Sequence, residues 1–173
     1  MGFYGARIHR SIQKGGVVKV FVAAPFSSMI NSQGFFMKQY RERLSQLHKS
    51  IEESGHSVFA SQRNENWGNA PLKPEEYVSI DYHELSFSDV VVAVLGARPS
   101  LGVCIELGWA SALGIPIIVV GKRVSASTMI SGLHRVSKVN YIPADLEDSK
   151  LPIPILFNQI EKYLHGERCD ADT

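Results

Sequence analysis

Residues 89–120, DVVVAVLGARPSLGVCIELGWASALGIPIIVV, combine two strongly apolar segments with a helical pattern between them. The first segment, 89–96, is rich in Val and lacks polar alternation, which predicts a strand buried on both faces. A Pro-Ser-Leu-Gly turn follows, and apolar residues continue to Gly114, which predicts a helix over 102–113. Residues 116–121 form the second apolar segment. This order predicts a parallel pair of strands joined by a crossover helix.

The same alternation extends through the rest of the 173-residue chain. Strands are predicted at 17–25, 56–61 and 137–142, helices at 35–54, 74–88 and 152–165, a short turn or helix at 125–133, and a polar loop at 62–73. This pattern is typical of a flavodoxin-like (Rossmann-like) three-layer α/β sandwich with a five-stranded parallel sheet in the order 2-1-3-4-5. We expect one domain over 17–165, a flexible leader over 1–16 and a tail over 166–173.

Composition excludes several classes of protein. The formal net charge of +1 gives no strong field for nucleic acid or an anionic membrane surface. The two cysteines, Cys104 and Cys169, form no disulfide framework, and neither they nor the histidines show metal-ligand spacing, so we expect no metal and no cofactor. The chain has no apolar run of membrane-spanning length, and 1–16 has no apolar signal core, so we expect a cytoplasmic protein.

Two loops are predicted to meet at one edge of the sheet. In such folds the ligand binds outside the carboxyl ends of the strands, at the switch point between the first and third strands. The loops there are APFSS (24–28) and ARPSLG (97–102). Ser100 and Gly102 stand where a helix begins, and its free N–H groups predict an anion site. The alternative is that Ser100 only caps the helix and Gly102 only permits the turn.

Glu106 is the lone carboxylate of the apolar helix. It lies one helical turn after Gly102 and therefore on the same face. A partly desolvated carboxylate beside an anion site is a candidate nucleophile or base. The alternative is a structural Glu that pairs with an Arg or caps a neighbouring loop. Asp81 and Glu84 compete as the second carboxylate of the site, whereas Asp89 opens a strand and is interpreted as a cap or turn residue.

Aromatic residues could stack on a base near this edge. Phe26 follows Pro25 at the end of the first strand, which places it near the site. Trp67 is a second candidate, although it could equally anchor its loop to the core.

Several short motifs of this chain carry a resemblance to a known family: FVAAPF, RNENWG, DYHE, IELGWASALGIP and SGL. Together with the Asp–Ser–Glu spacing of DYHELSFSDVVVAVLGARPSLGVCIELG, they resemble the nucleoside 2-deoxyribosyltransferase superfamily over roughly residues 18–142. Within it, the chain looks like the branch that hydrolyses the N-glycosidic bond of nucleoside 5′-monophosphates. It is similar in particular to the CMP and hydroxymethyl-CMP hydrolases of the mildiomycin type.

The resemblance assigns catalytic and phosphate-binding roles. It implies that Glu106 is the nucleophile and that Asp81 orients the nucleophile and the sugar or assists the departing base. It places phosphate binding on Ser100 and Gly102. A further phosphate-binding serine, donated by the neighbouring subunit of a homodimer, falls on Ser127.

The resemblance also assigns the base and sugar site, to Phe21, Ala24, Phe26, Ser27 and Trp67. The branch specific for deoxynucleotides has Tyr where this chain has Phe21, so Phe favours ribonucleotides. The hydroxymethyl-CMP enzyme has Arg at the position of Ser27, so unsubstituted CMP fits at least as well.

The implied reaction is hydrolysis of CMP or 5-hydroxymethyl-CMP to the free base and ribose 5-phosphate, through a covalent glycosyl–Glu106 intermediate. Two other readings stay open. A deoxyribosyltransferase would pass the sugar to a second base, and a nucleotide-binding sensor would bind without turnover. Fold alone cannot separate the three.

Overall fold

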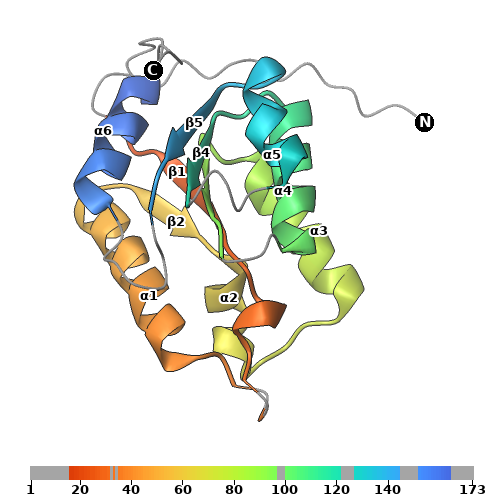
Figure 1. Ribbon diagram of the computed structural model, residues 1–173. Helices are drawn as coiled ribbons and strands as arrows, with labels where there is room; N and C mark the ends of the chain where they lie inside the picture. Colours follow the sequence, from red (N-terminus) through yellow and green to blue (C-terminus); the bar gives the residue numbers. More distant parts are fainter. Residues whose placement is uncertain are drawn as a thin grey trace.

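A five-stranded parallel sheet forms the centre of the computed structural model (Figure 1). Its strands are β1 (Lys19–Ala23), β2 (Ser57–Phe59), β3 (Val90–Val94), β4 (Ile117–Val120) and β5 (Val139–Ile142). They lie in the order β2-β1-β3-β4-β5, which confirms the predicted topology. The structure describes residues 16–31, 33, 35–96, 100–121, 127–144 and 152–164, without the side chains of Ser27, Tyr163 and Leu164. The predicted tail and all but the last residue of the predicted leader lie outside these ranges.

The helices are α1 (Lys38–Glu53), α2 (Ser61–Asn64), α3 (Pro74–Ser86), α4 (Leu101–Ala112), α5 (Thr128–Gly132) and α6 (Ile153–Leu164), with short 3-10 turns η1 (Ser27–Met29), η2 (Asn66–Gly68) and η4 (Leu133–Arg135). The long helices agree with the predictions to within a few residues at each end. The predicted polar loop 62–73 was wrong in part, because α2 and η2 occupy its first half. Such short turns carry no helical periodicity that a sequence could show.

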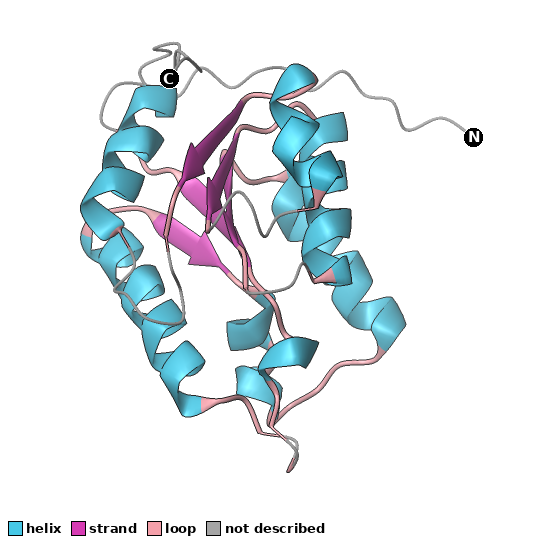
Figure 2. Ribbon diagram, viewed as in Figure 1, coloured by secondary structure: helices cyan, strands magenta, loops and turns pink. Residues whose placement is uncertain are grey.

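Two layers of helices cover the sheet (Figure 2). Val20 and Val22 of β1 pack toward α1 and α6, whereas Phe21 and Ala23 pack toward α3, α4 and α5. Every residue of β3 is buried, as expected for a central strand covered on both sides. The sandwich thus has three layers, with the core divided between the two faces of the sheet.

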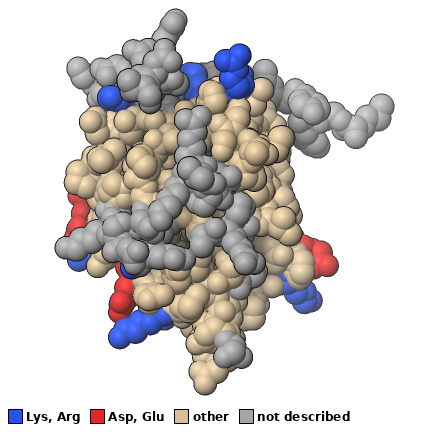
Figure 3. Space-filling view, viewed as in Figure 1, with Lys and Arg blue, Asp and Glu red and all other residues tan. Residues whose placement is uncertain are grey.

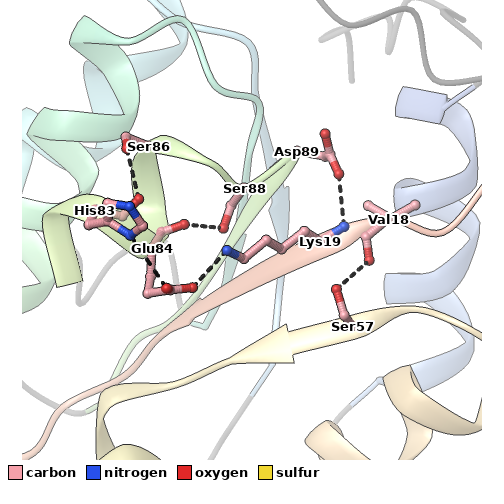
Figure 4. Close-up of polar contacts among 8 residues, drawn as sticks. All are labelled: Val18, Lys19, Ser57, His83, Glu84, Ser86, Ser88 and Asp89. Atoms are coloured by element: carbon pink, nitrogen blue, oxygen red, sulfur yellow. Dashed lines mark hydrogen bonds and ion pairs between the residues drawn. The ribbon is translucent and has the colours of Figure 1, made fainter. Parts of the chain in front are cut away.

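Charged side chains tie the amino-terminal edge of the sheet together (Figure 4). The backbone N–H of Lys19 donates to Oδ2 of Asp89 at 2.8 Å, and its Nζ lies 2.7 Å from Oε2 of Glu84. Asp89 therefore binds backbone where a strand opens, as its position predicted. The Lys19 contact lowers the pKa of Glu84. Glu84 thus forms an ion pair at the amino-terminal edge of the sheet.

Figure 3 shows the described Lys, Arg, Asp and Glu side chains of one face near its outline. Within the described ranges, no helix is long and apolar enough to cross a membrane.

Candidate active site

The carboxyl ends of three neighbouring strands place the candidate residues at one edge of the sheet. β1 pairs with β3 up to Ala23 opposite Ala93, and with β2 up to Phe21 opposite Phe59. Because the strands are parallel, the segments that follow them leave the sheet on the same side. These segments lead to Ala24, to Ser61 at the start of α2, and to Ser100 at the start of α4.

Glu106 and Asp81 come together from two adjacent helices. Asp81 lies in α3 and Glu106 in α4, and these helices pack side by side on the sheet (Figure 1). Burial raises the pKa of Glu106 well above its ordinary value, and the charge of Asp81 raises it further. Glu106 keeps partial exposure as a residue, so it is its carboxyl group that is withdrawn from water. The two carboxyl groups are close enough to disfavour ionisation of both.

Asp81 is the more enclosed residue of the pair, with 8% of its surface exposed. Burial raises its pKa to about 6, a hydrogen bond from Ser61 opposes this shift, and the charge of Glu65 adds to it. Ser61 Oγ donates to Asp81 Oδ1 at 2.7 Å. In the described part of the chain, no Lys, Arg or His forms an ion pair with Asp81 or Glu106. We therefore expect this pair of acids to hold a proton near neutral pH.

The amino terminus of α4 has the features expected of an anion site. Ser100 occupies the cap position, but its side chain makes no capping hydrogen bond. A Cβ placed on Gly102 would lie 3.7 Å from Ser100 Oγ, so the hydroxyl lies beside the exposed Gly102. The alternative that Ser100 serves as a side-chain cap is therefore not what the structure shows. The first N–H groups of a helix attract anions.

Ser127 caps α5. Its Oγ accepts a hydrogen bond from the backbone N–H of Ile130 at 3.3 Å. Within a single chain, the Ser127 hydroxyl therefore acts as the cap of α5. The role predicted for Ser127 in a neighbouring subunit stays a prediction.

The residues predicted for the base and sugar differ in their accessibility. Phe21 is fully buried and stacks on Phe59, with ring centroids 5.5 Å apart. Phe26 is half-buried, 5.8 Å from Phe36 between ring centroids. Ala24 is buried, and its carbonyl accepts from Nε2 of Gln62 at 2.5 Å. The Ser27 side chain lies outside the described part of the structure. Of Phe21 and Phe26, Phe26 is thus the residue with exposed ring surface that a base can contact.

Trp67 is an anchor of its loop. It has a left-handed backbone conformation (φ 57°) and a buried side chain. Its ring contacts Phe36 edge-on at 5.4 Å and stacks near His48 at 6.1 Å, and the Arg41 guanidinium lies 5.5 Å from the ring centroid. This packing matches the alternative that Trp67 fixes the loop to the core.

The sequence analysis missed three residues around the site: Ser61 and Glu65, which act on Asp81, and Gln62, which bonds to the Ala24 carbonyl. All three lie in α2 or directly after it, in the segment predicted as a strand end and polar loop. Glu65 is buried, and its Oε2 accepts the N–H of Leu72 at 3.2 Å. Their one available signal was their position after the second strand, beside the switch point.

Comparison with models of known protein families identifies one that matches this chain. The family model described as nucleoside 2-deoxyribosyltransferase matches residues 31–152. The chain belongs to this family. The match spans β2, α3, β3 and α4 and thus includes both Asp81 and Glu106. The predicted superfamily is confirmed.

Individual relatives narrow the type of enzyme. The structure of the CMP N-glycosidase BcmB of Clostridium botulinum shares 28% identity and a TM-score of 0.60, covering 81% of this chain and 98% of that one. The solution structure of BlsM shares 30% identity and a TM-score of 0.68, covering 88% and 93%. A Syntrophotalea carbinolica protein, named as a 2′-deoxynucleoside 5′-phosphate N-hydrolase, is 28% identical over 108 residues, 60% of this chain and 75% of that protein. The chain thus belongs with enzymes that break or transfer N-glycosidic bonds.

Among the described residues, no group of three His, Cys, Asp or Glu side chains could hold a metal ion.

Proposed function

We propose that the protein hydrolyses the N-glycosidic bond of a pyrimidine nucleoside 5′-monophosphate, CMP or 5-hydroxymethyl-CMP, to the free base and ribose 5-phosphate. The interacting acids Asp81 of α3 and Glu106 of α4 carry this proposal, with Glu106 one helical turn after Gly102 at the end of α4 where we propose that the anion binds. Similarity to a CMP N-glycosidase and to a nucleoside 5′-phosphate N-hydrolase supports it. Glu84, the competing carboxylate, is bound to Lys19 at the opposite edge of the sheet.

The first step is attack of the Glu106 carboxylate on C1′ of the nucleotide. A bond forms between Oε of Glu106 and C1′, and the bond between C1′ and the base nitrogen breaks through a transition state with oxocarbenium character. Cytosine leaves poorly as an anion, so it takes a proton from Asp81. Because the pKa of Glu106 is raised well above its ordinary value, the reactive form is the one in which the proton held by the two acids has moved to Asp81 and Glu106 is ionised. Asp81 is then ionised and the glycosyl group is an ester of Glu106.

Water completes the reaction. Asp81, now a carboxylate, accepts a proton as water attacks C1′, and the ester bond to Glu106 breaks. Ribose 5-phosphate leaves, Glu106 is again a carboxylate and Asp81 is again protonated. The sum is nucleotide plus water giving base plus ribose 5-phosphate, with one acid serving both steps as in retaining glycosidases.

The phosphate supplies binding energy without changing its bonds. Ser100, Gly102 and the first N–H groups of α4 would hold it, and Ser127 of the partner subunit would complete the site in a homodimer. Such remote binding places C1′ against Glu106. A nucleoside without phosphate should therefore be a very poor substrate.

The base would lie against Phe26, near Ala24 and Ser27, with Phe21 packed beneath this end of the sheet. Ser27 offers no positive charge to a substituent at position 5 of the base, so CMP fits at least as well as its hydroxymethyl derivative. We propose a loop-anchoring role for Trp67, in line with its burial.

The test is incubation of the purified protein with CMP, 5-hydroxymethyl-CMP, dCMP, UMP, AMP, GMP and cytidine, followed by chromatography of the free bases. We expect cytosine from CMP, nothing from cytidine, and nothing from the folded Glu106→Gln variant. Binding of nucleotides without release of any base would overturn the proposal and favour a sensor. Because the family model is that of transferases, a second assay adds a competing base and looks for exchange in place of hydrolysis.

A further inference from the structure

We infer that Ser61 is a positioning residue of this site. Its hydroxyl holds Oδ1 of Asp81 in place, so that the other carboxyl oxygen, Oδ2, donates and accepts the proton during N-glycosidic cleavage. This inference rests on the proposed function. It begins from the hydrogen bond of 2.7 Å from Ser61 Oγ to Asp81 Oδ1, which links residues 20 positions apart in the chain.

The carboxyl group of Asp81 needs such a partner. It is buried and faces two other acids, Glu106 from α4 and Glu65 from the end of α2. Both neighbours repel its charge, and Ser61 is the hydrogen-bond donor to its side chain in the described part of the chain. A hydroxyl that donates to Oδ1 favours the carboxylate form and holds the group in one orientation.

Ser61 is itself held firmly. It begins α2, and a single residue, Ala60, separates it from the end of β2. The next residue, Gln62, donates to the carbonyl of Ala24 at 2.5 Å, which ties α2 to the end of β1. Trp67, packed in the core, fixes the far end of the same segment. The segment between β2 and α3 thus supports the hydroxyl from both sides, which is what precise placement of a catalytic acid requires.

Loss of the hydroxyl should have two separate effects. Asp81 should titrate at a higher pH in Ser61→Ala than in the parent, because the bond that opposes protonation is gone. Turnover of CMP should fall about 10- to 100-fold, the usual range for a hydrogen bond to a charged group. Ser61→Thr retains the hydroxyl and should recover most of both losses.

The experiment combines a titration with kinetics. ¹³C NMR of labelled aspartate follows Asp81 in the parent, Ser61→Ala and Ser61→Thr, and Asp81→Asn identifies its resonance. The pH profile of kcat/KM is measured on the same proteins, and its basic limb should move to higher pH in Ser61→Ala. Ser57→Ala is the matched control, because Ser57 lies at the other end of β2 with only a 3.4 Å contact to the Val18 carbonyl (Figure 4).

A double-mutant cycle separates positioning from a general structural role. If Ser61 acts through Asp81, Ser61→Ala should cost nothing further in an Asp81→Asn background. Equal losses in both backgrounds would overturn the inference. So would an unchanged Asp81 titration in Ser61→Ala, even in an enzyme that hydrolyses CMP. Failure of the parent protein to cleave any nucleotide would instead overturn the proposed function, whatever the titration shows.

Discussion

At the scale of single residues, the site holds two acids in surroundings that disfavour their ionised forms. The folded protein raises the pKa of both Asp81 and Glu106. An acid with a raised pKa binds its proton more tightly in the folded state than in the unfolded state. The folded state is therefore favoured while the acid is protonated. That advantage is lost as pH rises from the ordinary value of the acid through its folded value.

Asp81→Asn should therefore stabilise the protein at about pH 8 while it impairs turnover. A pKa of about 6 in the folded protein against the ordinary value of 3.8 corresponds to about 3 kcal/mol of unfolding free energy at most. The gain should vanish near pH 3, where Asp81 is mostly protonated in both states. Urea unfolding at the two pH values measures it. Glu84→Gln is the control of opposite sign, because the pKa of Glu84 is lowered and its charge is stabilised by Lys19.

His48 gives the protein an acid sensitivity of its own. Its ring is 2% exposed, neither ring nitrogen has a hydrogen-bond partner among the described residues, and burial lowers its pKa to about 4. The unfolded chain thus takes up this proton first as pH falls below about 6.5. The stability held by neutral His48 should decline between that pH and about 4.

His48→Phe should remove this decline and keep an aromatic ring beside Trp67. At about pH 5 we expect the variant to lose about 2 kcal/mol less unfolding free energy, relative to pH 7, than the parent. Urea unfolding at both pH values measures the difference. His83→Phe, at an exposed position, should show no such change. Parallel pH dependence in parent and His48→Phe would contradict the assignment.

Elements of this fold differ in how far the sequence predicts them. β3, α4 and β4 follow from uninterrupted apolar runs and from Gly114, which has φ 67° after the helix. α2 and η2 do not, because contacts from other parts of the chain fix them: Gln62 to Ala24, and Trp67 among Phe36 and His48. The same contacts support the loop-anchoring role that we propose for Trp67. The contact of Ser61 with Asp81 therefore could not be predicted from the sequence and follows only from the three-dimensional structure.

Gly102→Ala tests the amino terminus of α4. Helix propensity favours alanine by up to about 1 kcal/mol, and among the described residues the new methyl group meets only Ser100 Oγ, at 3.7 Å, so the variant should fold with equal or greater stability. Within the described part of the chain the methyl group thus has room, but it would stand where we place the phosphate, so KM for CMP should rise at least about 10-fold.

Gly108→Ala is the matched control in the same helix. Its added Cβ meets no atom of the described residues within 4 Å, so it should bring a similar gain in stability with an unchanged KM. Equal KM values for the two variants would remove the phosphate from this end of α4.

At the scale of the whole molecule, one side of the sandwich carries exposed apolar side chains. They include Tyr82 of α3, Leu101 and Ile105 of α4 and Met129 of α5, the last beside the Ser127 cap. Leu101 and Met129 are 83% and 82% exposed. Apolar surface of this kind often marks a protein interface. It supports the proposed homodimer. The sequence pattern alone could not show this surface, since buried apolar residues such as Val103 stand between the exposed ones in the same helix.

A homodimer that shares its sites can be tested by mixing two inactive variants. Glu106→Ala removes the nucleophile, and Ser127→Asp places a negative charge against the phosphate while it keeps an oxygen that can cap α5. If Ser127 serves the partner's site, a mixed dimer has one site with both defects and one site with neither. Random exchange of subunits should then restore about one quarter of parental activity.

Subunit exchange itself needs a control, which differently tagged parental chains provide by co-purification. Each variant assayed alone should remain inactive, so that any recovery belongs to the mixed dimer. If Ser127 instead serves the site of its own chain, every site in a mixed dimer carries one defect. Mixing would then restore nothing even with full exchange, and the shared-site arrangement would be excluded.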